Sequence, residues 1–123
     1  MEQKLIIEGR LPSLNEIIDE ARYNRYASNN QKQTYNDLVY LSAKSQNLKP
    51  FTKKINLKFS WYCKDRRRDK DNIMAGQKYV LDGLQLAGII ENDGWKEIGD
   101  IYHKFYVDKD NERIEILMKE VEE

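Results

Sequence analysis

Cysteine, proline and histidine are scarce in this chain of 123 residues, which has one cysteine, two prolines and one histidine. The single cysteine, Cys63, excludes an internal disulfide and a cluster of thiolate metal ligands. The single histidine, His103, leaves a zinc site or a Ser-His catalytic triad without the partners that such sites need. The sequence therefore points away from a disulfide-stabilised secreted domain, a zinc enzyme and a serine hydrolase.

Long apolar runs are also missing. No stretch approaches the roughly twenty apolar residues needed to cross a bilayer, and the opening Met1–Lys4 lacks the apolar core of a signal peptide. The length suits one domain over residues 1–123, with a thin core, since charged residues make up 34% of the chain. We therefore expect a single cytoplasmic domain with no membrane partner. Dimerisation would help to complete its thin core.

Charge of one sign is not in excess, because 21 Lys and Arg balance 21 Asp and Glu. The balance hides an asymmetry along the chain. Residues 1–78 hold 16 basic against 9 acidic side chains, and residues 79–123 hold 5 against 12. Such an asymmetry indicates a polyanionic partner for the basic part, unless folding interleaves the two halves.

Apolar periodicity predicts a strand and two helices in the first part of the chain. A short strand spans residues 4–8. Ser13 then begins a short helix, with Glu16 as its capping-box acid. The polar residues 28–30 are expected to cap a longer helix that ends at residues 47–50, because its apolar positions follow helical spacing.

The second part of the chain predicts three strands and one helix. Apolar and polar residues alternate over residues 55–62, which is typical of a strand with one buried face. A helix over residues 71–87, capped by its first or second residue, ends at Gly88. Residues 98–107 and 113–121 alternate again and are interpreted as a closing hairpin. This order, β-α-α-β-α-β-β, predicts an α/β (α+β) domain with a mixed four-stranded sheet flanked by helices.

The most informative stretch is Lys64–Asn72, Lys-Asp-Arg-Arg-Arg-Asp-Lys-Asp-Asn, which begins where the strand over residues 55–62 ends. In an extended segment, side chains two residues apart point the same way, so Asp69 and Asp71 can share one hard cation. The three preceding arginines suit phosphate, because guanidinium offers a planar fork of donors. Carboxylates that can bind a metal, placed beside basic side chains that can bind a nucleic-acid backbone, are typical of a metal-dependent nuclease. The simpler interpretation is a solvated charged loop.

Further charged residues follow on the predicted helix and beyond it. On one continuous helix, Asp71, Lys78 and Asp82 lie within about 20° of each other around the axis. Lys78 and Asp82 are also an i,i+4 pair, so they are either a surface ion pair or a lysine held beside an acidic cluster near a scissile phosphate. Two glycines after the helix let the chain double back, which would bring Asp93 toward Asp69 and Asp71.

Residues 66–93 resemble the RusA-type Holliday-junction resolvases. The shared pattern is an Arg-rich R-x-x-D-x-D-N motif, then Lys and Asp four residues apart, then a later Asp; Leu11–Asn15 is also similar to an N-terminal P-S-x-N element. One departure concerns the lysine, which the family pattern places four residues after the second aspartate, whereas Lys78 lies seven after Asp71. The extra residues either move the lysine about 4.5 Å along one helix or are absorbed before a later helix that starts at Gly76.

This resemblance implies a small homodimeric, magnesium-dependent endonuclease, of a kind common in prophages, that cuts four-way DNA junctions in recombination and repair. Oxygen-only ligands favour Mg²⁺, or Mn²⁺, over zinc, and no small-molecule cofactor is expected. A two-fold homodimer suits a junction that needs two symmetric cuts. The expected site consists of Asp69, Asp71 and Asp93 as metal-binding catalytic acids, Lys78 as the catalytic lysine, and Lys64, Arg66, Arg67, Arg68 and Lys70 as DNA contacts.

Two other functions are compatible with these residues. One is a non-catalytic DNA-binding protein on the same scaffold, whose acids merely pair with its arginines. The other is a metal-dependent nuclease that acts on flaps or RNA. The D-x-D-N spacing and Asp93 favour catalysis, because a binding site gains nothing from repelling phosphate with three carboxylates. The segment Arg22–Tyr26 mixes bases with aromatic residues, as nucleic-acid surfaces and ordinary polar linkers both do.

Overall fold

Four strands form one mixed sheet in the computed structural model of the chain, which describes residues 1–122. Their order across the sheet is β1 (Glu2–Glu8), β4 (Arg113–Glu120), β2 (Ile55–Cys63) and β3 (Ile98–Val107). β4 is antiparallel to both β1 and β2, and β2 is parallel to β3. The predicted mixed four-stranded sheet and the order of elements are therefore confirmed.

The predicted closing hairpin is wrong, because β3 and β4 follow each other in the chain but lie on opposite sides of β2. Leu57 at the middle of the sheet pairs with Ile101 of β3 on one side and Met118 of β4 on the other. Alternation identifies a strand and its buried face, but it does not identify the strand's neighbour. The sequence pattern was therefore equally compatible with a hairpin and with the crossover that the chain adopts.

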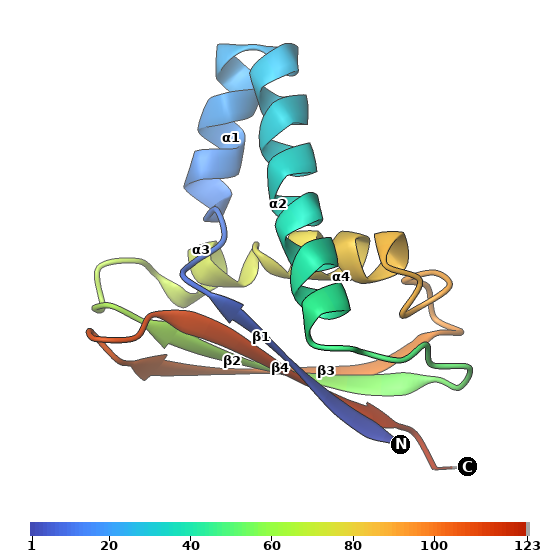
Figure 1. Ribbon diagram of the computed structural model, residues 1–123. Helices are drawn as coiled ribbons and strands as arrows, with labels where there is room; N and C mark the ends of the chain where they lie inside the picture. The colour runs from blue at the N-terminus through green and yellow to red at the C-terminus, as the bar shows by residue number, and fades with distance from the viewer. Residues whose placement is uncertain (123) are drawn as a thin grey trace.

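The helices lie on one face of the sheet (Figure 1). They are α1 (Leu14–Tyr23), α2 (Arg25–Ser45), α3 (Lys70–Met74) and α4 (Gln77–Leu86). α3 and α4 lie across the sheet, whereas α1 and the first part of α2 stand side by side as an arm that projects away from it (Figure 1). α1 has no fully buried residue; it packs along α2, and only its partly buried Ile17 contacts the core.

Side-chain caps fix where the arm helices begin. Ser13 caps α1 as predicted: its Oγ accepts the Glu16 N–H at 3.4 Å and lies 3.3 Å from Glu16 Oε1. The predicted cap of α2 at residues 28–30 is wrong. Asn24 takes this role, because its extended backbone precedes the helix and its Oδ1 accepts the Ala27 N–H at 2.6 Å. The arm is therefore continuous helix except at Asn24.

The helix predicted over residues 71–87 is two helices, with a break at Ala75–Gly76. Gly76 passes close to the core, since a Cβ there would lie 3.0 Å from Leu11 Cβ and 3.2 Å from Trp61 Cη2. The residues that lengthen the family spacing are thus absorbed between α3 and α4, which was the second of the two predicted alternatives. Asp69, rather than the predicted Asp71 or Asn72, is the N-cap of α3.

This break also overturns the shared helical face predicted for three charged residues. Asp71 lies in α3, whereas Lys78 and Asp82 lie in α4. The angular argument required one axis for all three residues, and two helices separated by a glycine do not provide it. Only the pair within α4 keeps its predicted relation.

The core lies between the sheet and the helices. Its largest fully buried side chains come from β1, β2, β4, α2, α4 and the turn after α4, and include Leu5, Ile7, Val39, Ile55, Leu57, Phe59, Val80, Leu84, Ile89, Ile116 and Met118. α4 approaches α2 so closely that a Cβ on Gly83 would overlap the Val39 side chain. Gly83 is therefore required by the close packing of α4 on α2.

A charged and aromatic network covers the helix-free face of the sheet. Arg113 donates from Nε to Glu115 Oε2 at 2.8 Å, and its guanidinium lies 3.8 Å from the ring centre of Tyr62. Lys4 Nζ lies 2.7 Å from the other oxygen of Glu115. Tyr62 in turn stacks on Tyr106 of β3, with ring centres 4.8 Å apart. This face is therefore ordered by polar contacts rather than by a second layer of helices.

Candidate functional site

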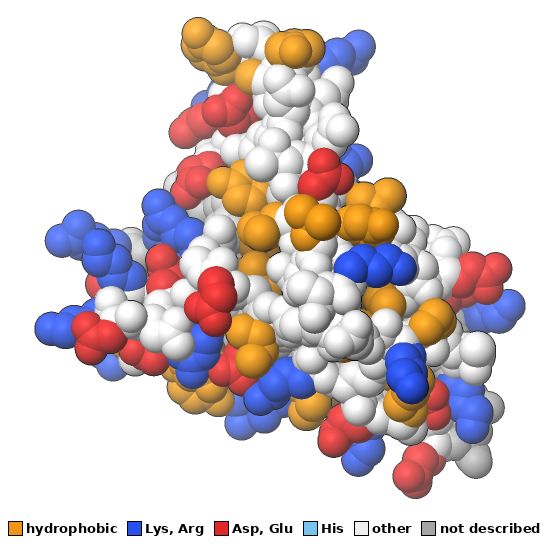
Figure 2. All heavy atoms as spheres, in the orientation of Figure 1, with side chains coloured by type: hydrophobic (Ala, Val, Ile, Leu, Met, Phe, Trp, Pro, Cys, Tyr) orange, Lys and Arg blue, Asp and Glu red, His pale blue; other side chains and the backbone are white. Residues whose placement is uncertain are grey.

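The Arg- and Asp-rich stretch forms the loop after β2 and the start of α3, as predicted. In the space-filling view, Lys, Arg, Asp and Glu side chains gather at the end of the molecule where this loop lies (Figure 2). The loop, α3 and the end of β3 border a hollow of about 870 Å³. Its lining consists of Cys63, Asp65, Arg66, Arg68, Asp69, Lys70, Asp71, Ile73, Phe105, Tyr106 and Val107.

Asp69 and Asp71 both line this hollow and both are exposed. Asp69 is the N-cap residue of α3, with φ −69° and ψ 152°, yet its side chain forms no capping hydrogen bond. Asp71 lies in the first turn of that helix. Within residues 1–122, neither carboxylate has an ion-pair partner. The two acids predicted to share a cation are thus brought to one hollow and left open to solvent.

The arginines beside them differ in what holds them. Arg68 Nη2 lies 3.5 Å from Glu112 Oε2, and only 20% of its side chain is exposed. The same Glu112 oxygen accepts the Lys64 N–H at 3.2 Å, so Glu112 anchors both ends of the loop. Arg67 is 90% exposed and lies 3.7 Å from Asp65 Oδ2, which is a loose surface pair. Arg68 is therefore a structural anchor, and Arg67 faces solvent.

The remaining basic residues of the loop are also accessible. Arg66 is exposed, and no residue among 1–122 forms an ion pair with it. Lys70 is exposed, with its Nζ 5.5 Å from the ring centre of Phe105. Both line the hollow. Cations and carboxylates thus share one surface, which suits a ligand that carries phosphate and approaches with a metal ion.

Cys63 borders the hollow, and its thiol is buried. Burial raises the pKa of the Cys63 thiol, and the positive charge of Arg68 opposes that rise only in part. A thiol must lose its proton to ligate a metal. The exposed acidic donors that line the hollow are the carboxylate oxygens of Asp65, Asp69 and Asp71.

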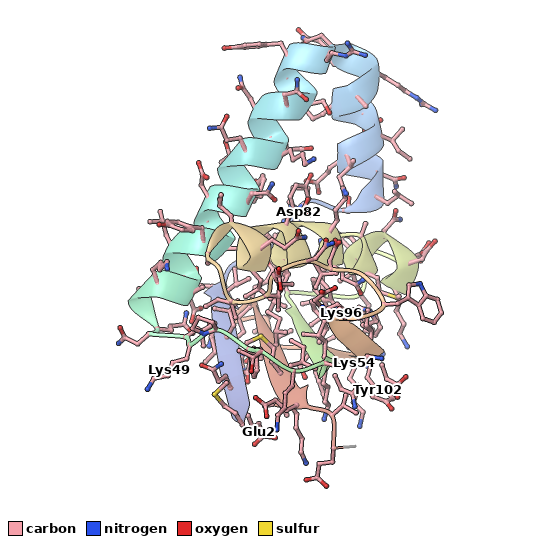
Figure 3. The ribbon with its side chains drawn as sticks, turned by 90° about the vertical axis from the view of Figure 1, so that its right-hand side faces the viewer. Glu2, Lys49, Lys54, Asp82, Lys96 and Tyr102 are labelled. Atoms are coloured by element: carbon pink, nitrogen blue, oxygen red, sulfur yellow. The ribbon has the colours of Figure 1, made fainter. Side chains whose placement is uncertain are left out.

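Lys78 and Asp82 form the predicted i,i+4 ion pair on α4, with Nζ 3.9 Å from Oδ2. Lys78 is 68% exposed, while Asp82 is only 20% exposed. Figure 3 shows Asp82 on the helical side of the sheet. Neither residue lines the hollow that contains Asp69 and Asp71. The pair lies on the surface of α4, and the short α3 separates it along the chain from the loop after β2.

A buried aromatic chain beneath α4 was not foreseen from the sequence. Trp61 Nε1 donates to His103 Nδ1 at 2.9 Å, and His103 Nε2 lies 2.8 Å from Gln77 Oε1. His103 also stacks on Phe59, with ring centres 5.0 Å apart. Since Nδ1 accepts, Nε2 carries the proton and donates to Gln77. Burial lowers the pKa of His103, so it stays neutral and ties β2 and β3 to the first residue of α4.

Asp93 lies at the other end of the sheet. The Gly94 carbonyl accepts the Ile98 N–H at 3.0 Å, and Ile98 pairs with Ile55, the first residue of β2. Asp69 follows the last residue of β2, a strand of nine residues that spans roughly 30 Å. Figure 1 shows the loop after β2 and the segment before β3 at opposite ends of the molecule. Within one copy of the chain, Asp93 does not join the other two aspartates.

Consistent with this separation, no group of three or more His, Cys, Asp or Glu side chains in residues 1–122 is arranged to hold a metal ion. The glycines after α4 do turn the chain, and Gly88 has φ +74°. The turn leads to the start of β3, however, because β3 is parallel to β2. The predicted hairpin of β3 and β4 did not specify the direction of β3 relative to β2.

The segment Arg22–Tyr26 lies at the end of the arm, where α1 meets α2 (Figure 1). Tyr23 is 81% exposed and Tyr26 is 76% exposed, which is far above the exposure of a core tyrosine such as Tyr79 at 4%. No acidic residue occurs between Ala21 and Gln33. The arm therefore presents two aromatic rings among basic side chains, away from the body of the domain.

Comparisons with known proteins add no relative to this description. No protein-family model matches the chain, and no curated protein matches it. Among residues 1–122, no helix has the length and apolar character required to span a membrane.

Proposed function

We propose that this protein is a magnesium-dependent, structure-selective DNA endonuclease that resolves four-way junctions as a homodimer. The observation that carries the proposal is the pair Asp69 and Asp71, two exposed carboxylates without an ion-pair partner in residues 1–122. They stand beside exposed cations at one hollow. The resemblance of residues 66–93 to RusA-type resolvases supplies the substrate class.

The pairing of the loop arginines favours catalysis over simple binding. If the acids served only to neutralise arginines, Asp69 and Asp71 would be the expected partners. Instead, Arg67 pairs with Asp65 and Arg68 pairs with Glu112. Leaving two carboxylates open beside a phosphate-binding surface costs electrostatic energy, which a bound cation would offset. A function that uses the carboxylates is therefore better supported than one that does not.

The donor set of the hollow fits Mg²⁺. Mg²⁺ prefers oxygen ligands and usually keeps several waters, so one or two carboxylates suffice on the protein side. Asp69 and Asp71 would hold it, since both carboxylates line the hollow and both are exposed. When bound, the ion supplies a water of lowered pKa and neutralises charge on the phosphate.

The protein's own side chains would bind and orient the DNA backbone. Arg66 and Arg67 extend into solvent and offer guanidinium donors to phosphate oxygens. Lys70 adds a further cation and lines the hollow together with Arg66. Lys78 is placed on α4 outside it, so we assign it a contact with a more distant phosphate unless the DNA or a second copy of the chain alters the surface.

The test is incubation of the protein with a synthetic four-way junction, a flap and a linear duplex, each with Mg²⁺ and with EDTA. The proposal predicts cuts in the junction only with Mg²⁺, and no cuts in the duplex. Binding of all three DNAs without cutting would identify a DNA-binding protein instead. Preferential cutting of the flap, or of an RNA of the same shape, would keep the chemistry and replace the substrate.

A further inference from the structure

A second basic surface lies at the end of the sheet where β2 and β3 begin. It borders a hollow of about 1050 Å³. Four lysines line this hollow: Lys53 and Lys54 precede β2, Lys96 precedes β3, and Lys119 lies in β4. β2 has nine residues and spans roughly 30 Å, so this surface is separate from the loop that follows β2.

The lysines of this surface are not neutralised by neighbouring acids. Lys53, Lys96 and Lys119 are exposed, and Lys54 is half-buried. Within residues 1–122, none of the four forms an ion pair. Three glutamates also line the hollow, but one of them, Glu120, lies 3.2 Å from the chain's amino group. The positive charge of the lysines therefore remains available to a polyanion.

Backbone hydrogen bonds fix the segments that present these lysines. The Ile55 N–H donates to the Glu97 carbonyl at 3.0 Å. This bond joins the segment of Lys54 to that of Lys96. The Lys54 carbonyl in turn accepts the Val121 N–H at 2.8 Å, just after the end of β4. Figure 3, which views the molecule from this end, shows Lys54 and Lys96 close to each other.

Trp95 stands beside this surface, directly before Lys96 in the chain. Its side chain is 94% exposed, which is more than any other large apolar side chain in residues 1–122. The turn that presents it is fixed, because the Gly94 carbonyl accepts the Glu97 N–H at 3.2 Å and the Ile98 N–H at 3.0 Å. Tryptophan is highly buried on average. This fixed ring instead offers its face to a ligand.

An open ring beside lysines suits a single strand of nucleic acid. An unpaired base has a free face that stacks on an aromatic ring, while its phosphates lie against nearby cations. Inside a duplex, both faces of a base are covered by its neighbours, so the ring has nothing to stack on. A membrane suits this surface less well, because insertion of Trp95 would bring the neighbouring Asp93 and Glu97 to the headgroups with it.

We propose that this surface is a second DNA-binding site, which takes an unpaired segment of one strand. A base stacks on the Trp95 ring, and the adjoining phosphates lie at Lys53, Lys54 and Lys96. A branch point at which bases unpair supplies such a segment. The inference rests on the proposed function for naming DNA as the polyanion, but its binding is measured in EDTA, where no cleavage is required.

Tryptophan fluorescence reports on this site directly. The chain has two tryptophans, and the other, Trp61, is only 3% exposed. Titration with oligothymidine in EDTA should quench the fluorescence of the parent protein, because a base covers the Trp95 ring. Trp95→Phe retains the signal of Trp61 and should show no quenching. A parent protein that single strands do not quench, or that duplex quenches equally, would overturn the proposed site.

Affinity separates stacking from charge. Trp95→Ala should weaken binding of oligothymidine about tenfold and leave duplex binding unchanged, whereas Trp95→Phe should keep most of the affinity because a ring remains. The double change Lys53→Gln and Lys96→Gln should lower the salt slope for single strands by about 1.4 units. Lys44→Gln with Lys104→Gln removes the same charge from two other exposed lysines and should not change the slope. Equal losses in both double variants would overturn the role of the lysines.

Two further results distinguish this inference from its alternatives. Vesicles that contain phosphatidylserine should neither bind the protein nor shift its fluorescence; binding to them, without binding to oligothymidine, would overturn the site in favour of a membrane surface. If Trp95→Ala binds single strands as the parent does while the parent cuts junctions, the inference fails and the nuclease function stands. If quenching and its loss in Trp95→Phe hold while no junction is cut with Mg²⁺, the nuclease function fails and the second site stands.

Discussion

At the residue scale, the loop after β2 contains two kinds of charged side chain. Arg68 is held by Glu112 and is mostly covered, so its charge already has a partner. Arg66 and Arg67 extend into solvent, as do the carboxylates of Asp69 and Asp71. This difference, invisible in a run of three arginines, separates the residues that hold the loop from those available to a ligand.

The arginines should therefore respond differently to truncation. Arg66→Ala and Arg67→Ala should each weaken junction and duplex binding alike and flatten the salt dependence of affinity by about one unit of slope, because each loses one phosphate contact. Arg68→Ala should instead lower stability by about 1 kcal/mol and change the salt slope less. Binding isotherms at several salt concentrations and urea denaturation measure both effects. An equal loss of slope in all three variants would refute the anchoring role of Arg68.

Asp71→Asn tests the open carboxylates without disturbing the fold. The variant removes one of two neighbouring negative charges, so its stability should equal or slightly exceed that of the parent. Cleavage should be abolished, while junction binding in EDTA should persist or tighten, since a charge that repels phosphate is gone. Thermal denaturation, a cleavage assay and a binding assay give the three readouts. Retained cutting would exclude Asp71 from the mechanism.

The sequence predicted the neighbours in this loop well and the distant member of the site poorly. Asp69 and Asp71 are two residues apart, so chain connectivity alone brings them together. Whether Asp93 joins them depends on the direction of β3, which the alternation of its residues does not encode. Local spacing determines local geometry, whereas a distant residue is placed by the topology of the sheet.

At the element scale, His103 ties β3 to β2 and α4 through Trp61 and Gln77. Burial lowers the pKa of His103 below its ordinary value of 6.5. The unfolded chain therefore takes up a proton that the folded chain resists. The free energy of unfolding should accordingly be highest above about pH 6.5 and fall as the pH drops below that value.

His103→Gln checks this pH dependence, because glutamine offers an acceptor and a donor but does not titrate. Urea denaturation between about pH 5 and pH 7.5 should give a flatter profile for the variant than for the parent. Arg113 holds the pKa of Asp108 below its usual range, and Lys4 does the same for Glu115, so these acids remain ionised in this window. An unchanged slope in the variant would assign the pH dependence to another group.

The arm of α1 and α2 gives a second prediction at this scale. Unpaired bases stack on exposed aromatic rings, so the double change Tyr23→Ala and Tyr26→Ala should weaken binding of a junction or a flap about tenfold, with little change for linear duplex. Phenylalanine at both positions should preserve binding because the rings remain. Leu41→Ala, an exposed apolar residue near the other end of α2, serves as control. Fluorescence anisotropy measures all four proteins, and unchanged affinity in the alanine variant would remove the arm from the DNA surface.

Elements with a strong internal period were predictable, and elements that depend on a single contact were not. β2 follows its alternation from end to end, and Ser13 caps α1 as its capping box indicates. The helix predicted over residues 71–87 breaks because Gly76 must pass Leu11 and Trp61, which are distant in the chain. Asn24 caps α2 through one side-chain hydrogen bond. The residues on both sides of Asn24 are compatible with a helix, so the sequence pattern does not mark this boundary.

At the scale of the whole molecule, the sheet interleaves the two halves of the chain. β4, from the acidic half, lies between β1 and β2 of the basic half. The charge asymmetry along the sequence is therefore not a division of the molecule into a basic and an acidic lobe. Lys4 and Arg113 form ion pairs with Glu115 on the helix-free face, so these basic side chains are neutralised within the sheet. If the proposed function holds, we expect its DNA contacts at the loop after β2 and at the arm.

The central claim is that two copies of this chain cut a four-way junction with Mg²⁺ held by Asp69 and Asp71. The most direct measurement uses a supercoiled plasmid whose inverted repeat extrudes a cruciform, with Asp71→Asn and a plasmid lacking the repeat as controls. The account predicts conversion of the cruciform plasmid to linear DNA only with Mg²⁺, because a two-fold dimer makes paired cuts across the junction. Neither control should be cut. A cruciform plasmid that remains supercoiled, or that Asp71→Asn linearises equally well, would contradict the account.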